Sequence, residues 1–466
     1  MRLYNTLSRT IEALSPLEPG KVKVYCCGPT VYNYQHLGNL RTYVFEDLLV
    51  RVLRYASYSV KHVMNITDVG HLVSDADEGE DKMALASKRE QKSSHEIAEF
   101  YTKVFLEHSA WLNIKQPDII CKATDHIPQM IALIKRLEAG GFAYQSGGNV
   151  YFDVARFPDY GKLAQLNLEA LKAGARIDVD ERKKHPLDFA LWFTKSKFEN
   201  QELQWDSPWG RGYPGWHIEC SAMSMSYLGE QFDIHCGGID HIPVHHTNEI
   251  AQSEAATGKQ LANIWLHGGF LLTDKEKMSK SKGEFLTLDV VRDRGFEPLA
   301  YRLFCLAGHY RRELQFSWEA LSGAQVNLEK WRNAVLSYKQ ESGRQSNGKP
   351  SSALSIELET QFRDAVFDDL GLARALAVVH RVISEALPAE EKLRLLLEFD
   401  QVLGLGLANW EAQVVEVPKQ VQELVSERER ARKEKRWKDA DILRDQIGQL
   451  GFVVEDKKEG AVVRKR

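Results

Sequence analysis

A strand, a loop with a glycine and a helix follow one another early in the chain, and this order constrains the fold more than any other stretch. Residues Lys21 to Cys27 (KVKVYCC) alternate, so neighbouring side chains point to opposite faces and only one of the paired cysteines can face a given site. Gly28 and Pro29 end this strand, and Leu40 to Tyr55 carries apolar residues at helical spacing. We expect the unit to place backbone N–H groups and His36 where a polyphosphate can bind.

Two further stretches extend this unit into a parallel sheet. Tyr58 to Asn65 is a predicted second strand, and Gln231 to Asp240 (QFDIHCGGID) is a predicted strand that ends in a double glycine, with a helix from about Val244. The end of such a strand is a natural place for a phosphate or a ribose. Asn263 to Leu272 is a candidate strand pair, and Leu286 to Ala307 begins a series of predicted helices.

The composition indicates a cytosolic enzyme. The 466 residues are 43% hydrophobic, but no apolar run is long enough to cross a bilayer, and residues 1–19 lack the pattern of a secretory leader. Six cysteines in so long a chain do not form a disulfide framework, which leaves metal binding or burial as their roles. The net charge is −4, yet the tail from Lys419 carries 14 Lys and Arg against 10 Asp and Glu, which is compatible with a nucleic-acid partner.

A metal site is one interpretation of four separated residues. His245 and Glu249 stand four residues apart and share one face if this segment is helical. Cys27 and Cys220 are the soft ligands that complete a set suited to tetrahedral Zn²⁺. The alternative is that lone cysteines are buried as small hydrophobic residues, which we expect for Cys26 and for the remaining cysteines 121, 236 and 305. The acidic stretch 74–82 lacks the ligand spacing of a calcium loop, and we interpret it as a solvated lid.

Several motifs resemble one known family. His36-Leu37-Gly38-Asn39 and Lys277-Met278-Ser279-Lys280-Ser281 resemble the HIGH and KMSKS signatures of class I aminoacyl-tRNA synthetases, with Asn39 in place of the second His. Within that class, CCGPTVYNYQHLGN, NITDVG, PGWHIECSAM, FDIHCGGID and HHTNEIAQSEA are similar to the cysteinyl-tRNA synthetase family. The resemblance extends from Leu3 to the end of the chain.

The resemblance implies a site for L-cysteine. It assigns one Zn²⁺ per chain to Cys27, Cys220, His245 and Glu249, and it places Thr67, Trp216 and His235 around the substrate cysteine. Cysteine and serine differ only by sulfur for oxygen, so the shape of a pocket separates them poorly. A zinc ion with an open position binds the substrate thiolate in preference to a hydroxyl.

The resemblance also implies sites for ATP and tRNA(Cys). The resemblance assigns His36, Lys277 and Lys280 to catalysis, and it implies that Mg²⁺ binds together with ATP. The implied ATP-binding residues are His36, Gly38, Asn39, Asp240, Lys277, Ser279, Lys280 and Ser281. The cysteinyl group then passes to the terminal ribose of the tRNA. The implied anticodon contacts are Arg432, Trp437, Asp441 and Asp456, where Trp offers a stacking plane and Arg and Asp offer polar contacts to bases.

The expected fold is α/β. A Rossmann-type catalytic domain with parallel strands holds an inserted domain and is followed by an α-helical bundle and a small C-terminal α+β tRNA-binding domain. The expected boundaries are 1–115 and 205–265 for the two halves of the catalytic domain, 116–204 for the insertion, 266–318 for the KMSKS loop and stem-contact region, 319–408 for the bundle and 409–466 for the anticodon-binding domain. We expect a cytoplasmic monomer with no membrane partner.

Two other functions remain open at this point. The ligase that joins cysteine to an amino sugar in mycothiol synthesis resembles the same adenylating core but lacks the full tRNA-reading tail. A non-catalytic RNA-binding relative would retain the fold, but the intact KMSKS motif and four candidate zinc ligands argue against it.

Overall fold

A five-stranded parallel sheet forms the centre of the larger part of the chain, as expected for an α/β protein. Its strands lie in the order β11 (Ala262–Gly268), β10 (Phe232–Gly238), β3 (Lys21–Cys26), β4 (Ser59–Ile66) and β5 (Ile119–Lys122). From β3 the chain proceeds to β4 on one side, and from β10 it proceeds to β11 on the other. The strand order therefore reverses between β3 and β10, and a ligand crevice is expected at the carboxyl ends of these two strands.

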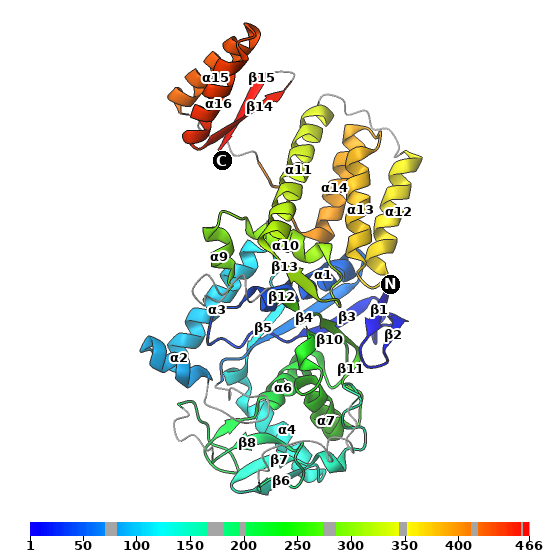
Figure 1. Cartoon of the computed structure of the whole chain (residues 1–466). Coiled ribbons are helices and arrows are strands. Elements are labelled where there is room, and N and C mark those ends of the chain that lie inside the picture. Colours follow the sequence, from blue (N-terminus) through cyan, green and yellow to red (C-terminus); the bar gives the residue numbers. More distant parts are fainter. Residues whose placement is uncertain are drawn as a thin grey trace. The chain divides into compact units, whose positions relative to one another are not determined.

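The computed structural model describes residues 1–69, 82–165, 181–195, 202–273, 286–343, 352–411, 418–457 and 460–465 (Figure 1). Two compact units, Met1–Asn409 and Trp410–Arg466, are each described by themselves. Among the helices in these ranges, none has the length and apolar character needed to cross a membrane. The KMSKS motif and nearly all of the acidic stretch 74–82 fall outside the described residues.

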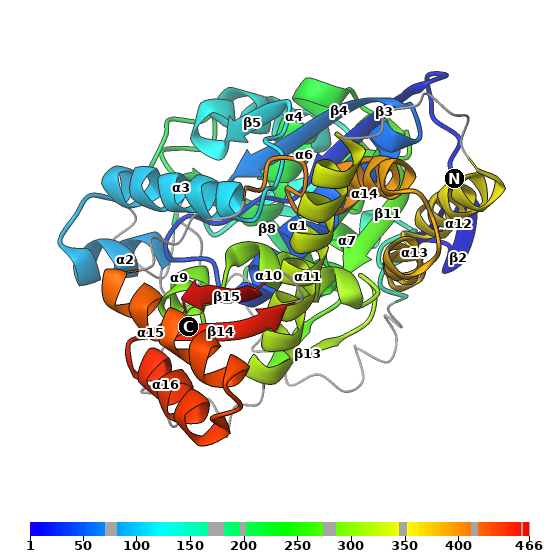
Figure 2. The ribbon, with the colours of Figure 1, turned by 90° about the horizontal axis from the view of Figure 1, so that it is seen from above.

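Helices cover both faces of the sheet. One face packs on α1 (Leu37–Tyr55), which also contacts α10 (Pro298–Ala307) and α14 (Ala389–Leu403) (Figure 2). The bundle is completed by α11 (Trp318–Ser342), α12 (Ala353–Phe367) and α13 (Leu372–Ser384). The opposite face packs on α4 (Ile127–Ala139), α6 (Trp216–Leu228) and α7 (His245–Thr257) (Figure 1). Because each face is covered, the strands are largely buried on both sides, as is usual for a parallel sheet.

The first helix begins at Leu37, three residues earlier than predicted, because His36 caps it. The Nδ1 atom of His36 accepts a hydrogen bond from the backbone N–H of Asn39, at 3.1 Å. A side-chain acceptor at this position satisfies one of the N–H groups that a helix leaves unpaired at its start. The HLGN motif is therefore the capped entrance of α1.

A buried ion cluster connects α1 to the helical bundle. The Oδ2 atom of Asp47 accepts hydrogen bonds from Arg51 Nε at 2.7 Å and from Arg302 Nη2 at 2.6 Å. The remaining guanidinium N–H groups donate to backbone carbonyls, including those of Gln401 and Leu403 at the end of α14. Burial would raise the pKa of Asp47, but Arg302 and Arg51 outweigh it and lower that pKa. The charges are paired and their polar atoms satisfied, which is the condition for burying them.

The inserted sheet has the order β6 (Ala143–Ser146), β7 (Asn149–Phe152), β8 (Phe189–Phe193) and β9 (Tyr213–Pro214). The preceding β5 and α4 lie within the predicted insertion 116–204, but β5 belongs to the central sheet. The insertion sheet thus begins after α4, later than the expected boundary. The remaining elements of this unit are β1 (Arg2–Asn5), β2 (Thr10–Ala13), α2 (Lys82–Glu90) and α3 (Ser94–Trp111).

Two predicted elements downstream were wrong. The predicted strand pair 263–272 is instead β11 of the central sheet and β12 (Leu271–Thr273), which pairs in parallel with the distant β13 (Leu314–Phe316). The predicted helix 286–307 is divided into α9 (Leu288–Asp293) and α10, because Gly295 has a φ of 81° and Pro298 starts a new helix.

The smaller unit consists of a helix pair and a hairpin. It contains α15 (Lys419–Lys433), α16 (Trp437–Gln449), β14 (Phe452–Lys457) and β15 (Gly460–Lys465), with the two strands antiparallel. Val421, Ile447, Phe452 and Val454 form its core. The predicted terminal hairpin is confirmed, and the unit begins at Trp410, one residue after the expected start.

Candidate active site

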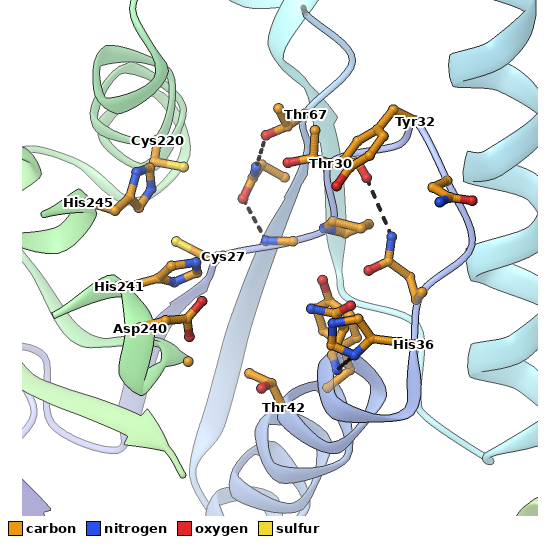
Figure 3. A pocket seen from close by; sticks show the side chains of 18 of the residues that line it. Cys27, Thr30, Tyr32, His36, Thr42, Thr67, Cys220, Asp240, His241 and His245 are labelled. Atoms are coloured by element: carbon orange, nitrogen blue, oxygen red, sulfur yellow. Dashed lines mark hydrogen bonds between the residues drawn. The ribbon is translucent and has the colours of Figure 1, made fainter. Parts of the chain in front are cut away.

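A cavity of about 230 Å³ lies at the carboxyl ends of β3 and β10, where the strand order reverses. Its lining combines the loop after β3, the start of α1, the loop after β10 and residues of α6 and α7. Figure 3 shows Cys27, Cys220 and His245 on one side of the cavity and His36 on the other. Three residues that the resemblance assigns to zinc, Cys27, Cys220 and His245, therefore line the same space as three that it assigns to ATP, namely His36, Asn39 and Asp240.

Cys27, Cys220, His245 and Glu249 form a compact set of potential metal ligands. One donor atom from each lies within 4.8 Å of those of the other three, and all four residues are buried. Cys27 follows β3, Cys220 lies in α6, and α7 presents His245 and Glu249 on one face, one turn apart. Two sulfurs, one imidazole nitrogen and one carboxylate oxygen fit Zn²⁺ with tetrahedral preference.

The electrostatics of this set favour a bound cation. Burial raises the pKa of Cys27, whereas a hydrogen bond with Cys27 lowers the pKa of Cys220 to about 7. Burial would lower the pKa of His245, but Glu249 and Cys220 outweigh it and raise that pKa to about 10. Two sulfurs and a carboxylate thus stand close together in a buried place, and a divalent cation would favour their ionised forms.

His246 belongs to a second set that sequence reasoning missed. Cys27, His235, His246 and Glu249 also offer donor atoms within 4.8 Å of one another. A catalytic zinc needs an open coordination position that the substrate can reach. Cys27, Cys220 and His245 line the cavity, whereas His235 and His246 do not. The first set therefore suits a metal that meets a substrate.

The histidines of the second set instead lie behind the first set and contact its members. His246 Nε2 lies 3.3 Å from Cys27 Sγ, and its Nδ1 lies 2.8 Å from His267 Nε2. His267 Nδ1 in turn lies 2.8 Å from the hydroxyl of Thr6. Burial lowers the pKa of both histidines, so both are neutral. No sequence signal connects these residues, because they come from β11, α7 and the loop after β1.

Only two of the three residues predicted to surround the substrate cysteine line the cavity. Thr67 and Trp216 line the cavity, and the Trp216 ring lies 4.5 Å from that of His245. His235 lies behind the cavity, fully buried, where its Nε2 is 3.0 Å from Glu249 Oε2 and its ring stacks on Trp265. In this structure His235 orients a potential metal ligand and does not line the cavity.

The nucleotide side of the cavity holds His36, Asn39 and Asp240. Burial lowers the pKa of His36, and Asp240 offsets part of that effect, so the ring is neutral. Since Nδ1 accepts the Asn39 N–H, the ring proton is on Nε2. A Cβ atom at Gly38 would lie 2.9 Å from the His36 ring, so the glycine is required by the folded position of that ring. Lys277, Ser279, Lys280 and Ser281 lie outside the described residues.

Three of the four predicted anticodon contacts lie near the junction of α15 and α16 in the smaller unit. Trp437 is 57% exposed at the start of α16, with the guanidinium of Arg432 at 5.8 Å from the centre of its ring. Asp441 lies one turn further along α16 and pairs with Arg444 at 3.4 Å. Asp456 lies in β14, opposite Ala461. An exposed Trp beside an Arg is the combination that stacks on an unpaired base.

The fold is shared with solved synthetases. Methionyl-tRNA synthetase of Mycobacterium tuberculosis, solved in complex with methionyl-adenylate, aligns with a TM-score of 0.58 and 17% identity over 83% of this chain and 90% of that chain. At this identity the likeness shows the fold alone. A family model described as the class I (C) tRNA synthetase catalytic domain matches residues 13–326. The larger unit is therefore a class I tRNA synthetase catalytic domain with its adjoining helices.

More similar relatives define the family. A cysteine–tRNA ligase of Treponema denticola is 50% identical over 98% of both chains, and one of Burkholderia lata is 49% identical over 99% of this chain and 96% of its own. The anticodon-binding domain model of cysteinyl-tRNA ligases matches residues 415–464. The chain belongs to the cysteine–tRNA ligase family.

Proposed function

We propose that this chain activates L-cysteine with ATP and transfers it to the terminal ribose of tRNA(Cys). The observation that carries the proposal is the cavity shared by a buried two-cysteine, histidine and glutamate set and by the HLGN helix entrance. The match of residues 415–464 to an anticodon-binding domain supports tRNA, and not an amino sugar, as the acceptor. We further propose that the chain works as a monomer in the cytosol, where its tRNA is.

The metal set would select the amino acid. When bound, Zn²⁺ supplies a Lewis acid that prefers a thiolate to a hydroxyl, so cysteine is favoured over serine without editing. Cys27, Cys220, His245 and Glu249 would hold it. Around the substrate, Thr67 and Trp216 bound the space, and His235 holds Glu249 in position from behind.

The other half of the cavity would hold ATP with its Mg²⁺. The cysteine carboxylate attacks the α-phosphate, and pyrophosphate leaves. His36 donates from Nε2 to a phosphate oxygen, and Lys277 and Lys280 neutralise the charge that develops on the transferred group. Asn39, Asp240, Ser279 and Ser281 position the nucleotide. Positioning and electrostatics supply most of the acceleration in such a transfer.

The test is ATP–pyrophosphate exchange on protein of known metal content, with cysteine, with serine and without an amino acid. We expect exchange with cysteine alone, about one zinc per chain, and transfer of cysteine to tRNA(Cys) transcript but not to an amino sugar. Exchange without transfer to tRNA would favour the amino-sugar ligase. Absence of exchange by zinc-loaded protein would favour a non-catalytic RNA-binding relative.

A further inference from the structure

An exposed aromatic cluster lies beside the mouth of the cavity and has no part in the proposed cysteine or ATP sites. It consists of Tyr34, Phe100 and Tyr101. The Tyr34 ring meets Phe100 at 6.4 Å and Tyr101 at 5.3 Å between ring centres, in both cases edge to face. Tyr34 is 37% exposed and Phe100 is 38% exposed, whereas Tyr101 is buried and anchors the other two. Exposed aromatic rings in contact offer faces and edges against which a planar ligand can stack.

The cluster is continuous with the cavity. Tyr34 lies in the loop between β3 and α1 and is itself a lining residue of the cavity. Phe100 lies in α3, outside the lining. The rings therefore lead from the surface of α3 to the space that contains His36 and the potential zinc ligands. A ligand that stacks on Phe100 and extends past Tyr34 reaches the reaction centre.

Hydrogen bonds and a helix cap hold the cluster in place. The hydroxyl of Tyr101 donates to the Glu90 carboxylate, and Arg89 donates both to that hydroxyl at 3.3 Å and to the backbone carbonyl of Tyr32 at 3.4 Å. A capping box of Ser93 and Glu96 fixes the start of α3. Preformed rings on fixed elements lose little conformational entropy when they bind a planar ligand.

The chemistry fits the bases of single-stranded RNA. Every base has a π-face that stacks on an exposed aromatic ring without regard to sequence. The ammonium of Lys92 lies over the Phe100 ring, 4.8 Å from its centre, and pairs with Glu90 at 3.7 Å, so a base that stacks on this face takes the place of the ammonium. The acceptor ribose of a tRNA stands at the end of an unpaired strand, and that strand has to enter the cavity for the transfer to occur.

We propose that Tyr34 and Phe100 form a stacking platform for unpaired bases at the 3′ end of the tRNA. This inference rests on the proposed function, because it assumes that the acceptor is an RNA end. The platform orients the strand as it enters, so its contribution falls in the transfer step and in RNA binding. Activation of cysteine with ATP does not depend on it.

The test uses Phe100→Ala, with Phe100→Tyr as the variant that keeps the ring. Leu106→Ala is the matched control, because Leu106 is 37% exposed on the same helix but lies about 120° away from Phe100 around its axis. Two tRNA(Cys) transcripts are compared at one salt concentration, one complete and one without its unpaired 3′ nucleotides. Pyrophosphate exchange, single-turnover transfer and RNA affinity are measured for each protein.

Phe100→Ala should weaken transfer, or binding of the complete tRNA, by about 5- to 150-fold, the range found for loss of one base stack. It should leave exchange within about twofold and bind the shortened tRNA as the unsubstituted chain does. Phe100→Tyr and Leu106→Ala should behave like the unsubstituted chain. An equal loss of affinity for the shortened tRNA, or unchanged transfer together with unchanged affinity for the complete tRNA, would overturn the platform. A parallel loss of exchange would assign the ring to ATP instead. Inactivity of the unsubstituted chain in exchange would contradict the proposed function itself.

Discussion

The backbone of Thr287 pairs with the backbone of His36. The neighbouring N–H of Leu37 donates to the carbonyl of Leu286 at 2.8 Å. Thr287 also caps α9, which is held to α3 because His108 Nε2 lies 3.1 Å from an Asp289 carboxylate oxygen. The structure describes the chain again from Leu286, five positions after Ser281, and Leu286 and Thr287 meet the capped entrance of α1.

This connection gives a prediction for Lys280. Lys280 stands six positions before Leu286, whose carbonyl accepts the backbone N–H of Leu37 beside His36. Lys280→Ala should slow cysteinyl-adenylate formation by about two orders of magnitude or more, the scale of a lost transition-state charge contact. Bound zinc should stay the same. Rapid-quench measurement of adenylate checks this, with Lys275→Ala as the control in the same segment. A normal rate would exclude the phosphate role of Lys280.

Gly38→Ala should lower the rate of pyrophosphate exchange with little effect on thermal stability. The added Cβ would lie 2.9 Å from the His36 ring and displace it, while alanine favours the helix by up to about 1 kcal/mol. We expect pyrophosphate exchange to fall at least about tenfold, whereas thermal stability should change little, because the loss of the His36 cap and the gain in helix propensity offset each other. Gly323→Ala is the control, since a Cβ there meets nothing within 4 Å. Full activity of Gly38→Ala would show that the ring position is not needed.

Cys220→Ser should reduce the zinc content and weaken cysteine binding. Replacement of a thiolate by a hydroxyl removes the softest kind of ligand from the set. Zinc per chain after dialysis and the KM for cysteine in exchange are the measurements. Cys305→Ser, a buried cysteine in α10 remote from the site, should keep its zinc. Equal zinc content in Cys220→Ser and the unsubstituted chain would remove Cys220 from the ligand set.

His62 gives a pH-dependent contribution to stability. Burial lowers the pKa of His62 to about 4, so the folded chain keeps this ring neutral where the unfolded chain protonates it. The unfolded state therefore binds more protons between pH 6.5 and 4, and stability falls as the pH falls through that window. From pH 7.5 to pH 5 this residue should cost about 2 kcal/mol of unfolding free energy. Urea unfolding of His62→Leu should show a shallower fall by about that amount; identical slopes would contradict the shift.

Trp437→Ala should affect tRNA and spare activation. The ring is 57% exposed next to Arg432, so its removal costs little packing but removes a stacking plane. We expect the KM for tRNA(Cys) in aminoacylation to rise by about tenfold, with exchange unchanged. Ile442→Ala, equally exposed on the same helix, is the control. Loss of exchange in step with charging would indicate a structural role for Trp437.

The parts of the fold that follow from local pattern were predictable. The strand ending at Cys26, the helix that carries His245 and Glu249, and the terminal hairpin all follow from periodicity and turn residues. The alternation in β3 correctly separates the two cysteines, since Cys26 packs in the core under α1 and Cys27 in the opposite cluster. Assembly of the four potential ligands came from the family resemblance, because spacing alone favoured their burial as separate residues.

The remaining features depend on contacts between distant segments. The chain from Thr6 through His267 to His246 joins residues that lie up to 261 positions apart, and no local pattern connects them. The parallel pairing of β12 with β13 is of the same kind. The break between α9 and α10 did carry a local signal, in Gly295 and Pro298, which the apolar spacing of that stretch obscured.

The ion cluster of Asp47, Arg51 and Arg302 limits where this chain can be divided. A fragment that ends before α14 would strip the carbonyls of Gln401 and Leu403 from two buried guanidinium groups in the catalytic half. The two guanidinium groups would then be buried in the hydrophobic core without these acceptors. Such a fragment should therefore not fold by itself. A cut near Trp410 leaves the cluster whole. Minimal versions of this enzyme for expression or engineering should therefore end after the bundle and never within it.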